Sequence, residues 1–133
     1  MTQVAIYGCG GVGREVAWLI EACNEVHPSY EIVCFVDDDP RNHGRRINGI
    51  VVLGLDEVRH RFPAARIVTA VGTPRARQSV VEKASAAGLG FETIVHPRVE
   101  RSRWIQIGEG TVICAGCILT TNIVLGRHVQ INL

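Results

Sequence analysis

A six-residue period of aliphatic residues near the carboxyl end constrains the fold of this chain more than any other feature of its sequence. Five positions keep the period: Ile107, Ile113, Leu119, Leu125 and Ile131. A period of six matches neither an α-helix, with about 3.6 residues per turn, nor a plain strand, whose side chains alternate. It is typical of hexapeptide repeats that wind into a parallel β-helix, with the aliphatic residue pointing into a triangular core.

We therefore predict that residues 98–133 form a connector and the first hexapeptide repeats of a β-helix. Arg101 stands one hexad before Ile107 and breaks the register, so we expect the β-helix to begin imperfectly. One turn is stable only when neighbouring turns cover its faces, which takes about three repeats or more. Because the sequence stops within a hexad and without a cap, we expect it to be the front part of a longer protein, truncated within its β-helix.

Residues 1–97 have the pattern of an α/β domain. Apolar runs predict strands at 4–7, 30–36, 50–53, 66–71 and 91–95, and helical spacing predicts helices at 15–26, 55–62 and 74–87. The predicted strands are uniformly apolar, which is typical of a parallel sheet with both faces covered. This order of elements predicts a Rossmann-like domain, whose last strand ends at Pro97.

A glycine-rich loop, residues 8–13, lies between the first predicted strand and the first predicted helix and contains the pattern GxGxxG. At this place in a Rossmann fold, backbone N–H groups and a helix N-terminus face a phosphate. Glycine is needed because a Cβ would keep an anion away from the backbone. Two interpretations stay open, since the glycines could serve only to bring helix and strand together. Arg14 could likewise pair with a phosphate or carboxylate, or be an exposed first-turn arginine.

Acidic residues follow the second predicted strand, about 20 residues past the glycine loop. Asp37 and Asp38 could hold ribose hydroxyl groups, and together these acids would repel a 2′-phosphate. They could instead form a solvated turn before Pro40, the interpretation that we favour for Asp39. Gly72 follows the fourth predicted strand and joins the acids at the carboxyl edge of the sheet, where open α/β sheets bind ligands. The sequence therefore predicts a nucleotide or nucleotide-sugar site.

Composition argues against several other functions. Lys and Arg number 14 against 13 Asp and Glu, so no basic excess favours nucleic acid, and aromatic residues, at 5%, are too few for a base-stacking platform. We expect no membrane insertion, because no apolar stretch reaches about 18 residues, and no signal peptide. Five cysteines, an odd number, predict a reduced, cytoplasmic protein.

We predict no catalytic or metal-binding set. Cys114 and Cys117 have a spacing found in zinc sites, but neither a second pair nor a histidine cluster accompanies them. His96 could approach a substrate but suits a structural turn better, and nothing near His128 would orient it as a base. We expect the remaining histidines to be solvated: His27, His43 and His60.

Five stretches carry a resemblance to a known family: IYGCGGVGREVAWLIE at 6–21, FVDDDPRNHGRRINGIVVLG at 35–54, AVGTPRAR at 70–77, IVHP at 94–97 and the hexads from 107. In this order they resemble the bacterial sialic acid O-acetyltransferase family, which includes the UDP-4-amino-sugar N-acetyltransferases of glycan biosynthesis. The resemblance implies a Rossmann-like domain that binds a nucleotide-sugar, such as a UDP-amino-sugar. A left-handed β-helix that binds acetyl-CoA and forms homotrimers would follow it.

The resemblance implies nucleotide-sugar contacts from Gly10, Gly11, Val12, Asp37, Asp38 and Gly72. The GxGxxG pattern adds Gly8 and Gly13 to the predicted substrate-binding residues. The family's catalytic histidine lies a short way beyond the asparagine that matches Asn132, where it would act as a general base on the sugar amine or hydroxyl. We therefore expect this chain to bind a nucleotide-sugar without catalysis, and to need no cofactor. Acetyl-CoA would be the co-substrate of the parent enzyme.

Two other classes stay open. GxGxxG followed by an acid also suits an NAD-binding oxidoreductase or redox sensor, although such a protein has no reason to continue into a β-helix. A noncatalytic module could bind the nucleotide-sugar and use the β-helix only to form trimers. The sequence leaves open which sugar is acylated, whether nitrogen or oxygen accepts the acyl group, and which acyl group is transferred.

Overall fold

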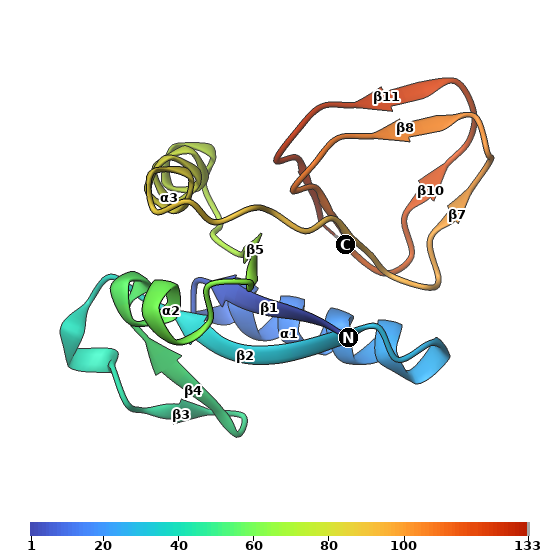
Figure 1. Cartoon of the computed structure of the whole chain (residues 1–133). Coiled ribbons are helices and arrows are strands. Elements are labelled where there is room, and N and C mark those ends of the chain that lie inside the picture. Colours follow the sequence, from blue (N-terminus) through green and yellow to red (C-terminus); the bar gives the residue numbers. More distant parts are fainter. Residues whose placement is uncertain (133) are drawn as a thin grey trace.

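The computed structural model describes residues 1–132, which form a sheet-and-helix layer joined to a three-sided coil (Figure 1). The helices are α1 (Gly11–Val26), the 3-10 helix η1 (Pro40–Asn42), α2 (Leu55–Arg61) and α3 (Pro74–Ala86). The strands of the layer are β1 (Thr2–Tyr7), β2 (Tyr30–Val36), β3 (Arg46–Ile47), β4 (Ile50–Leu53) and β5 (Arg66–Thr69). The strands of the coil are β6 (Ile94–Val95), β7 (Glu100–Arg101), β8 (Ile105–Ile107), β9 (Val112–Ile113), β10 (Ile118–Leu119), β11 (Ile123–Leu125) and β12 (Gln130–Ile131).

The five strands of the layer form one sheet in the order β3-β4-β2-β1-β5. β1 pairs in parallel with β2 and β5, and β2 pairs in parallel with β4, so the predicted α/β, Rossmann-like class is confirmed. β3 is an addition that the apolar pattern did not predict, because it is two residues long and pairs antiparallel with β4. The Asn48-Gly49 dipeptide, whose φ angles are 51° and 79°, makes this hairpin turn and was the available sequence signal.

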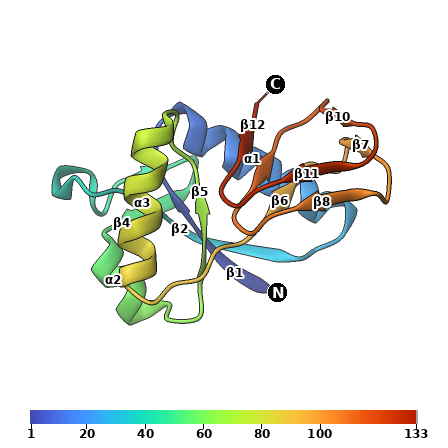
Figure 2. The ribbon, with the colours of Figure 1, turned by 90° about the horizontal axis from the view of Figure 1, so that it is seen from above.

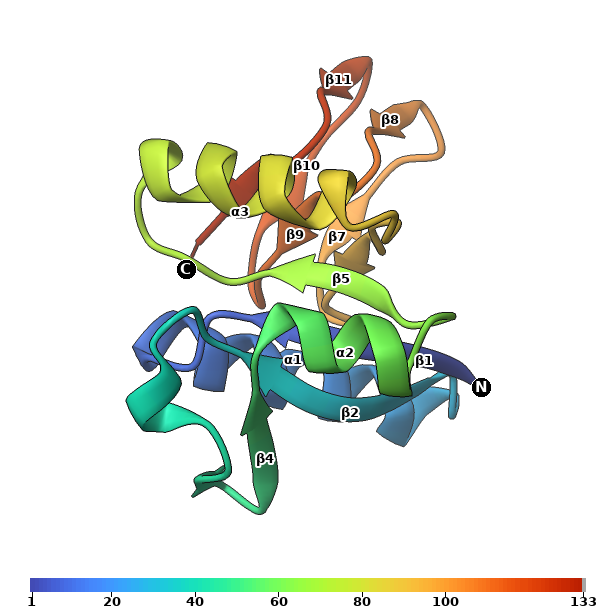
Figure 3. The same cartoon turned by 60° about the vertical axis from the view of Figure 1, so that its left-hand side comes forward.

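Both faces of the sheet are buried, and the alternation of side chains along β1 divides the core in two. Val4 and Ile6 pack with α1 on one face, whereas Ala5 and Tyr7 pack with residues of α2 and α3 on the other. Figure 3 shows α3 lying over β5. Burying each large aliphatic side chain contributes about 1.5–3 kcal/mol, which explains why the fully buried stretches of the central strands, such as 4–6 and 34–36, are apolar. Among residues 1–132, no helix combines the length and the apolar character that a membrane crossing requires.

The six-residue period produces a coil with three sides. Each strand pairs in parallel with one 18 residues further along the chain, so one turn uses three hexads. Figure 1 shows the triangular section, with β8 beside β11 on one side and β7 beside β10 on another. Ile113 and Leu119 are buried at the aliphatic positions, while Arg101 keeps the register opposite Leu119 but stays exposed. The coil therefore begins imperfectly, as expected, and its left-handed sense stays a prediction.

The last predicted strand, at 91–95, does not close the sheet. Phe91 makes only an isolated parallel bridge to Ile67, after which the chain leaves the sheet and Ile94 and Val95 pair with β9 of the coil. The Ile94 amide donates to the carbonyl oxygen of Thr111 over 3.0 Å. An apolar run has no marker of which sheet it will join, because pairing partners lie far away in the sequence. The domain limit at residue 97 stays a prediction.

The sheet and the coil share one hydrophobic core. Ile94, Val112 and Cys114 of the coil segment belong to the same buried cluster as Val16 and Ile20 of α1. Figure 2 shows α1 passing beside the coil. α1 therefore packs against the outer face of β6 and β9, because Ile94 and Val112 stand one residue before the inward-facing positions and point away from the centre of the coil.

His96 is buried at this junction, 1% exposed, with its ring centroid 5.5 Å from that of Trp18. Its Nδ1 accepts the amide of Arg98 over 3.0 Å, and its Nε2 is buried without a hydrogen-bond partner. Burial, with a smaller contribution from the Arg98 charge, lowers the pKa of His96 below its usual 6.5. Protonating Nδ1 would also remove the acceptor of the Arg98 amide, so the fold holds this ring neutral.

We expect the protein to lose stability as the pH falls below about 6.5, because His96 then binds a proton in the unfolded chain but stays neutral in the folded chain. Thermal denaturation between pH 8 and pH 5 should show a falling midpoint for the wild type and a shallower fall for His96→Gln. Burial also lowers the pKa of His128, so some slope remains in that variant. The exposed His27→Gln variant serves as the control and should keep the wild-type slope. Equal slopes for His96→Gln and the wild type would contradict the assignment.

Candidate functional site

A cavity of about 690 Å³ lies where β1, β2 and β5 reach their carboxyl ends. This volume falls within the range of about 300–1,000 Å³ of small-molecule sites, at the edge where parallel sheets bind ligands. The predicted site residues in its lining are Gly8, Gly10, Gly11, Val12, Asp37, Asp38 and Gly72. Gly13 is the predicted site residue that the structure leaves outside the lining.

The glycines of the loop divide into two kinds. Gly8 has φ of 126°, and a Cβ there would overlap the carbonyl oxygen of Ala70. A Cβ on Gly13 would overlap the carbonyl oxygen of Gly8, so these two glycines allow β1, α1 and the end of β5 to approach. Gly10 has open space around it, and Gly11 has only an Arg14 Nη2 atom, 4.0 Å away. The packing interpretation therefore fits Gly8 and Gly13, whereas Gly10 and Gly11 leave the backbone accessible from the cavity.

The N-terminus of α1 borders the cavity with its amides free for a ligand. Gly10 is the N-cap and supplies no side chain, and no acidic residue stands in the first turn. The first closed helical bond runs from the Arg14 amide to the Gly10 carbonyl oxygen over 3.0 Å. The preceding helical amides have no partner inside the helix, and the helix dipole adds partial positive charge there. This arrangement suits a phosphate.

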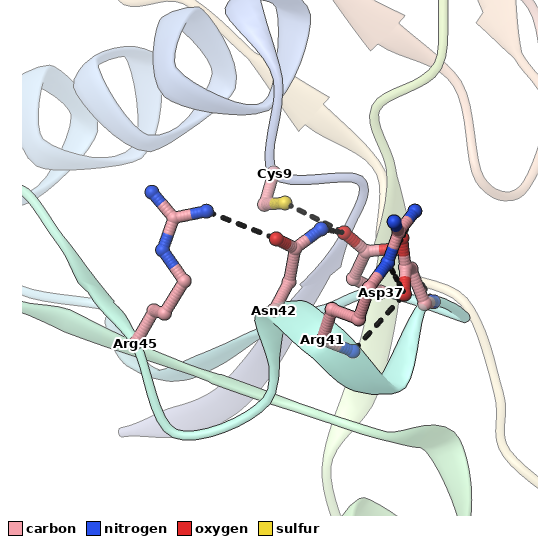
Figure 4. A network of polar contacts seen from close by, with 6 residues as sticks. Cys9, Asp37, Arg41, Asn42 and Arg45 are labelled. Carbon is pink, nitrogen blue, oxygen red and sulfur yellow. Dashed lines mark hydrogen bonds and ion pairs between the residues drawn. The ribbon is translucent and has the colours of Figure 1, made fainter.

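Asp37 ties the glycine loop to the loop after β2 (Figure 4). Its Oδ2 accepts the Cys9 thiol over 3.0 Å and the Asn42 amide over 2.6 Å, and its Oδ1 accepts the Asp39 backbone amide over 3.0 Å. Partial burial alone would raise the pKa of Asp37, but the three hydrogen bonds outweigh it and lower the pKa. A carboxylate has about four acceptor positions, so Asp37 keeps room for about one further donor.

The same contact makes Cys9 a poor nucleophile. Burial, followed by the hydrogen bond to the Asp37 carboxylate, raises the pKa of the Cys9 thiol to about 11. Because the thiolate is the reactive form, Cys9 stays a protonated hydrogen-bond donor near neutral pH. Its place in the lining is therefore structural, joining two loops.

Asp38 is held from the opposite side. Its Oδ1 accepts the Tyr7 hydroxyl over 2.6 Å, and its Oδ2 lies 2.8 Å from Lys83 Nζ. Partial burial would raise the pKa of Asp38, but Lys83 and Tyr7 outweigh it and lower the pKa, while burial raises the pKa of Tyr7 itself. Lys83 and Asp38 are half exposed, and such a pair contributes only about 0–1 kcal/mol. Its importance is that it orients the carboxylate. Asp39 caps η1, the turn role expected for it.

α3 and β1 supply a side of the cavity that was not predicted from the sequence. Ala76, Ser79 and Val80 of α3 line it, and Tyr7 and Asn42 join them. The three α3 residues have the spacing of one helix face, which was the available signal. Lys83 lies 45 residues from Asp38 in the chain, so no local sequence pattern predicts the contact between them.

The weaker candidates lie elsewhere. None of the five histidines is in the cavity lining; His27, His43 and His60 are exposed, as expected. Cys114 is buried in the shared core, and the Cys117 thiol donates to the carbonyl oxygen of Asn132 over 3.7 Å. Within residues 1–132, no three or more His, Cys, Asp or Glu side chains gather as metal ligands would.

A parallel sheet with a glycine loop, a free helix N-terminus and two acids around one cavity defines a Rossmann-like ligand-binding domain. The PglD N-terminal domain matches residues 3–84, and the chain belongs to this family. The resemblance to the amino-sugar N-acetyltransferases is thereby confirmed.

Three similar proteins illustrate the match. UDP-N-acetylbacillosamine N-acetyltransferase of Bacillus subtilis (strain 168) is 31% identical over 117 residues, 86% of this chain and 52% of that protein. The redox-sensing transcriptional repressor Rex of Latilactobacillus sakei subsp. sakei (strain 23K) is 32% identical over 91 residues, 67% of this chain and 42% of that protein. The solved structure of a perosamine N-acetyltransferase variant from Caulobacter crescentus with CoA and GDP-perosamine has a TM-score of 0.83 and 28% identity, over 99% of this chain and 60% of that one. The chain spans about half the length of the curated relatives it matches.

Alanine substitutions should separate the two kinds of glycine. We expect Gly13→Ala to lower the free energy of unfolding by about 2 kcal/mol, because the new methyl group would overlap the Gly8 carbonyl. Gly11→Ala makes the same change in open space and should leave stability unchanged or slightly higher. Chemical denaturation of both variants beside the wild type gives the comparison. Equal denaturation midpoints for the two variants would contradict the assignment of Gly13 to packing and of Gly11 to open space.

Proposed function

We propose that this chain is the nucleotide-sugar-binding part of a bacterial acetyl-CoA-dependent sugar N-acetyltransferase. The observation that carries the proposal is the cavity itself, bordered by an uncapped helix N-terminus and two ionised acids, and followed by a coil within one continuous fold. The perosamine N-acetyltransferase superimposes over 99% of this chain, sheet and coil together. That protein is described with CoA and GDP-perosamine, which supports the same ligand class here.

In this proposal, different residues of the cavity bind the diphosphate and the nucleoside of the ligand. The diphosphate lies at the N-terminus of α1, against the amides near Gly10, Gly11 and Val12. Asp37 and Asp38 accept hydrogen bonds from hydroxyl or base N–H groups of the nucleoside. Gly72 has no side chain, and this leaves space for the nucleoside beside Val12. Gly8 and Gly13 shape the loop without touching the ligand. The relatives are described with UDP-linked or GDP-linked sugars, so both nucleotides belong in the test.

The acetyl-transfer step is the further part of the proposal. Acetyl-CoA would supply the acyl group, and attack by the sugar amine needs a general base within hydrogen-bond reach. No histidine lines the cavity, and the two acids that do are already engaged in hydrogen bonds. We therefore propose that this chain binds the nucleotide-sugar and does not transfer the acetyl group by itself. A homotrimeric parent and a cytoplasmic location, consistent with five free thiols, complete the proposal.

The match to Rex favours a second candidate, a dinucleotide-binding redox sensor. Rex is 32% identical over 91 residues, a length that suits the sheet-and-helix layer. The coil supports the acetyltransferase instead, because Ile94, Val112 and Cys114 share the core of the sheet and the coil is therefore part of the fold.

Calorimetric titration with UDP, GDP, a UDP-amino-sugar and NADH tests the two candidates against each other. We expect saturable binding of a uridine or guanosine diphosphate ligand and none of NADH. Binding of NADH alone would overturn the acetyltransferase proposal in favour of the sensor. Binding of none of the four would contradict both.

Gly11→Asp should abolish nucleotide binding, because it places a carboxylate where the phosphates would meet the helix N-terminus. The position is open, so the fold should tolerate the side chain. Gly126→Asp is the matched control: it also lies in open space, but on the coil away from the cavity, and should keep wild-type affinity. The titration above provides the affinities. Unchanged affinity in Gly11→Asp would move the ligand away from the loop.

An acetyl-transfer assay tests the catalytic part. The wild-type chain, incubated with acetyl-CoA and a UDP-amino-sugar, should release CoA no faster than a blank without protein, because no histidine lines the cavity and the lowered pKa of Asp37 and of Asp38 makes them weak bases. Release above the blank that disappears with Gly11→Asp would show that the chain catalyses the reaction.

A further inference from the structure

A second, smaller cavity adjoins the first one. It has a volume of about 310 Å³ and is lined by Cys9, Arg14, Asn42, Arg45 and Ile47, of which Cys9 and Asn42 also line the larger cavity. We propose that Arg14 and Arg45 form an anion subsite here that takes a phosphate group. The sequence alone left the role of Arg14 open. In this proposal Arg14 binds phosphate together with Arg45, which lies 31 positions further along the chain.

Arg45 is held in place by the network that organises the larger site (Figure 4). Its Nη1 donates to Asn42 Oδ1 over 2.9 Å, and the Asn42 amide donates to Asp37 over 2.6 Å. Asp37 in turn accepts the Cys9 thiol of the glycine loop. The guanidinium is thus oriented before any ligand arrives, and its other N–H donors remain available. Preorganised donors lose less entropy when an anion binds.

Arg14 lines the same small cavity from α1. It stands in the first turn of α1, and its Nε donates to the carbonyl oxygen of Gly10 over 3.3 Å, which leaves the Nη groups free. Among the described residues, neither Arg14 nor Arg45 forms an ion pair, whereas Arg41, Arg66 and Lys83 each pair with a carboxylate. No carboxylate stands in the lining of the small cavity. Two guanidinium groups in the lining of one small cavity favour a phosphate, which they can bind through paired hydrogen bonds.

This inference deepens the proposed function and rests on it for the ligand that would bring the phosphate. Two sources have the required chemistry: the diphosphate of a nucleotide in the larger cavity, reaching across Cys9, and free inorganic phosphate or pyrophosphate. Because both cavities share Cys9 and Asn42, one ligand can contact both. The nucleoside half would meet Asp37 and Asp38, neither of which lines the small cavity.

The test compares Arg14→Gln and Arg45→Gln with the wild type and with Arg46→Gln. Arg46 is the matched control, because it lies on β3, lines neither cavity and donates to the carbonyl oxygen of Gly49. Each protein is titrated calorimetrically with UDP, GDP, uridine, guanosine and inorganic pyrophosphate, at two salt concentrations. All three arginines are exposed, so the variants should keep the wild-type melting temperature.

We expect each subsite variant to weaken diphosphate binding about tenfold, and to reduce its dependence on salt, while nucleoside binding and the Arg46→Gln control stay unchanged. Tighter binding of UDP or GDP than of pyrophosphate identifies the ligand's own diphosphate as the occupant. Comparable affinities identify a free anion.

Equal diphosphate affinity in the wild type and both subsite variants would overturn the subsite while the proposed function stands. Pyrophosphate binding that depends on the arginines, without binding of UDP or GDP, would support the subsite and contradict the proposed function. Wild-type protein that binds neither pyrophosphate nor a nucleoside diphosphate overturns the subsite, as does an equal loss of affinity in Arg46→Gln.

Discussion

The close approach of three backbone segments around Gly8 is the constraint on which the rest of the site depends. Gly8 lies against the Ala70 carbonyl at the end of β5, and Gly13 lies against the Gly8 carbonyl at the start of α1. No residue with a Cβ fits either position, and at Gly8 the φ of 126° adds to the requirement. This contact brings the N-terminus of α1 to the carboxyl edge of the sheet, where its free amides border the cavity.

The charge at the carboxyl edge of the sheet depends on the hydrogen bonds and the ion pair that Asp37 and Asp38 form. Asp37 is held by donors from both loops, and Asp38 by Tyr7 and Lys83, so the pKa of each carboxyl is lowered and both are ionised near neutral pH. Asp37 and Asp38 thus place negative charge in the lining of the cavity, the helix dipole adds positive charge at the glycine loop, and Arg14 lines the adjoining smaller cavity. This polarity is what a ligand with hydroxyl groups at one end and phosphates at the other would require.

The coil is tied to the sheet by a shared core. The chain leaves the sheet after Phe91 and enters the coil at Ile94, which packs with α1. α1 supplies the apolar cover for the outer face of β6 and β9, where Ile94 and Val112 lie. His96, buried neutral at this junction, makes the contact sensitive to acid. A site on the sheet and a coil beside it are therefore parts of one fold.

The sequence by itself determined the elements whose patterns are local. The six-residue period predicted the three-sided coil, the apolar runs predicted the parallel sheet, and the GxGxxG loop with Asp37 and Asp38 predicted the edge that holds the cavity. Only the tertiary structure decided that Gly13 packs whereas Gly10 faces the cavity, that β6 joins the coil, and that Lys83 reaches Asp38. The physical reason is that periodicity records which face of an element is buried, whereas the choice among distant partners depends on packing that no short stretch of sequence contains.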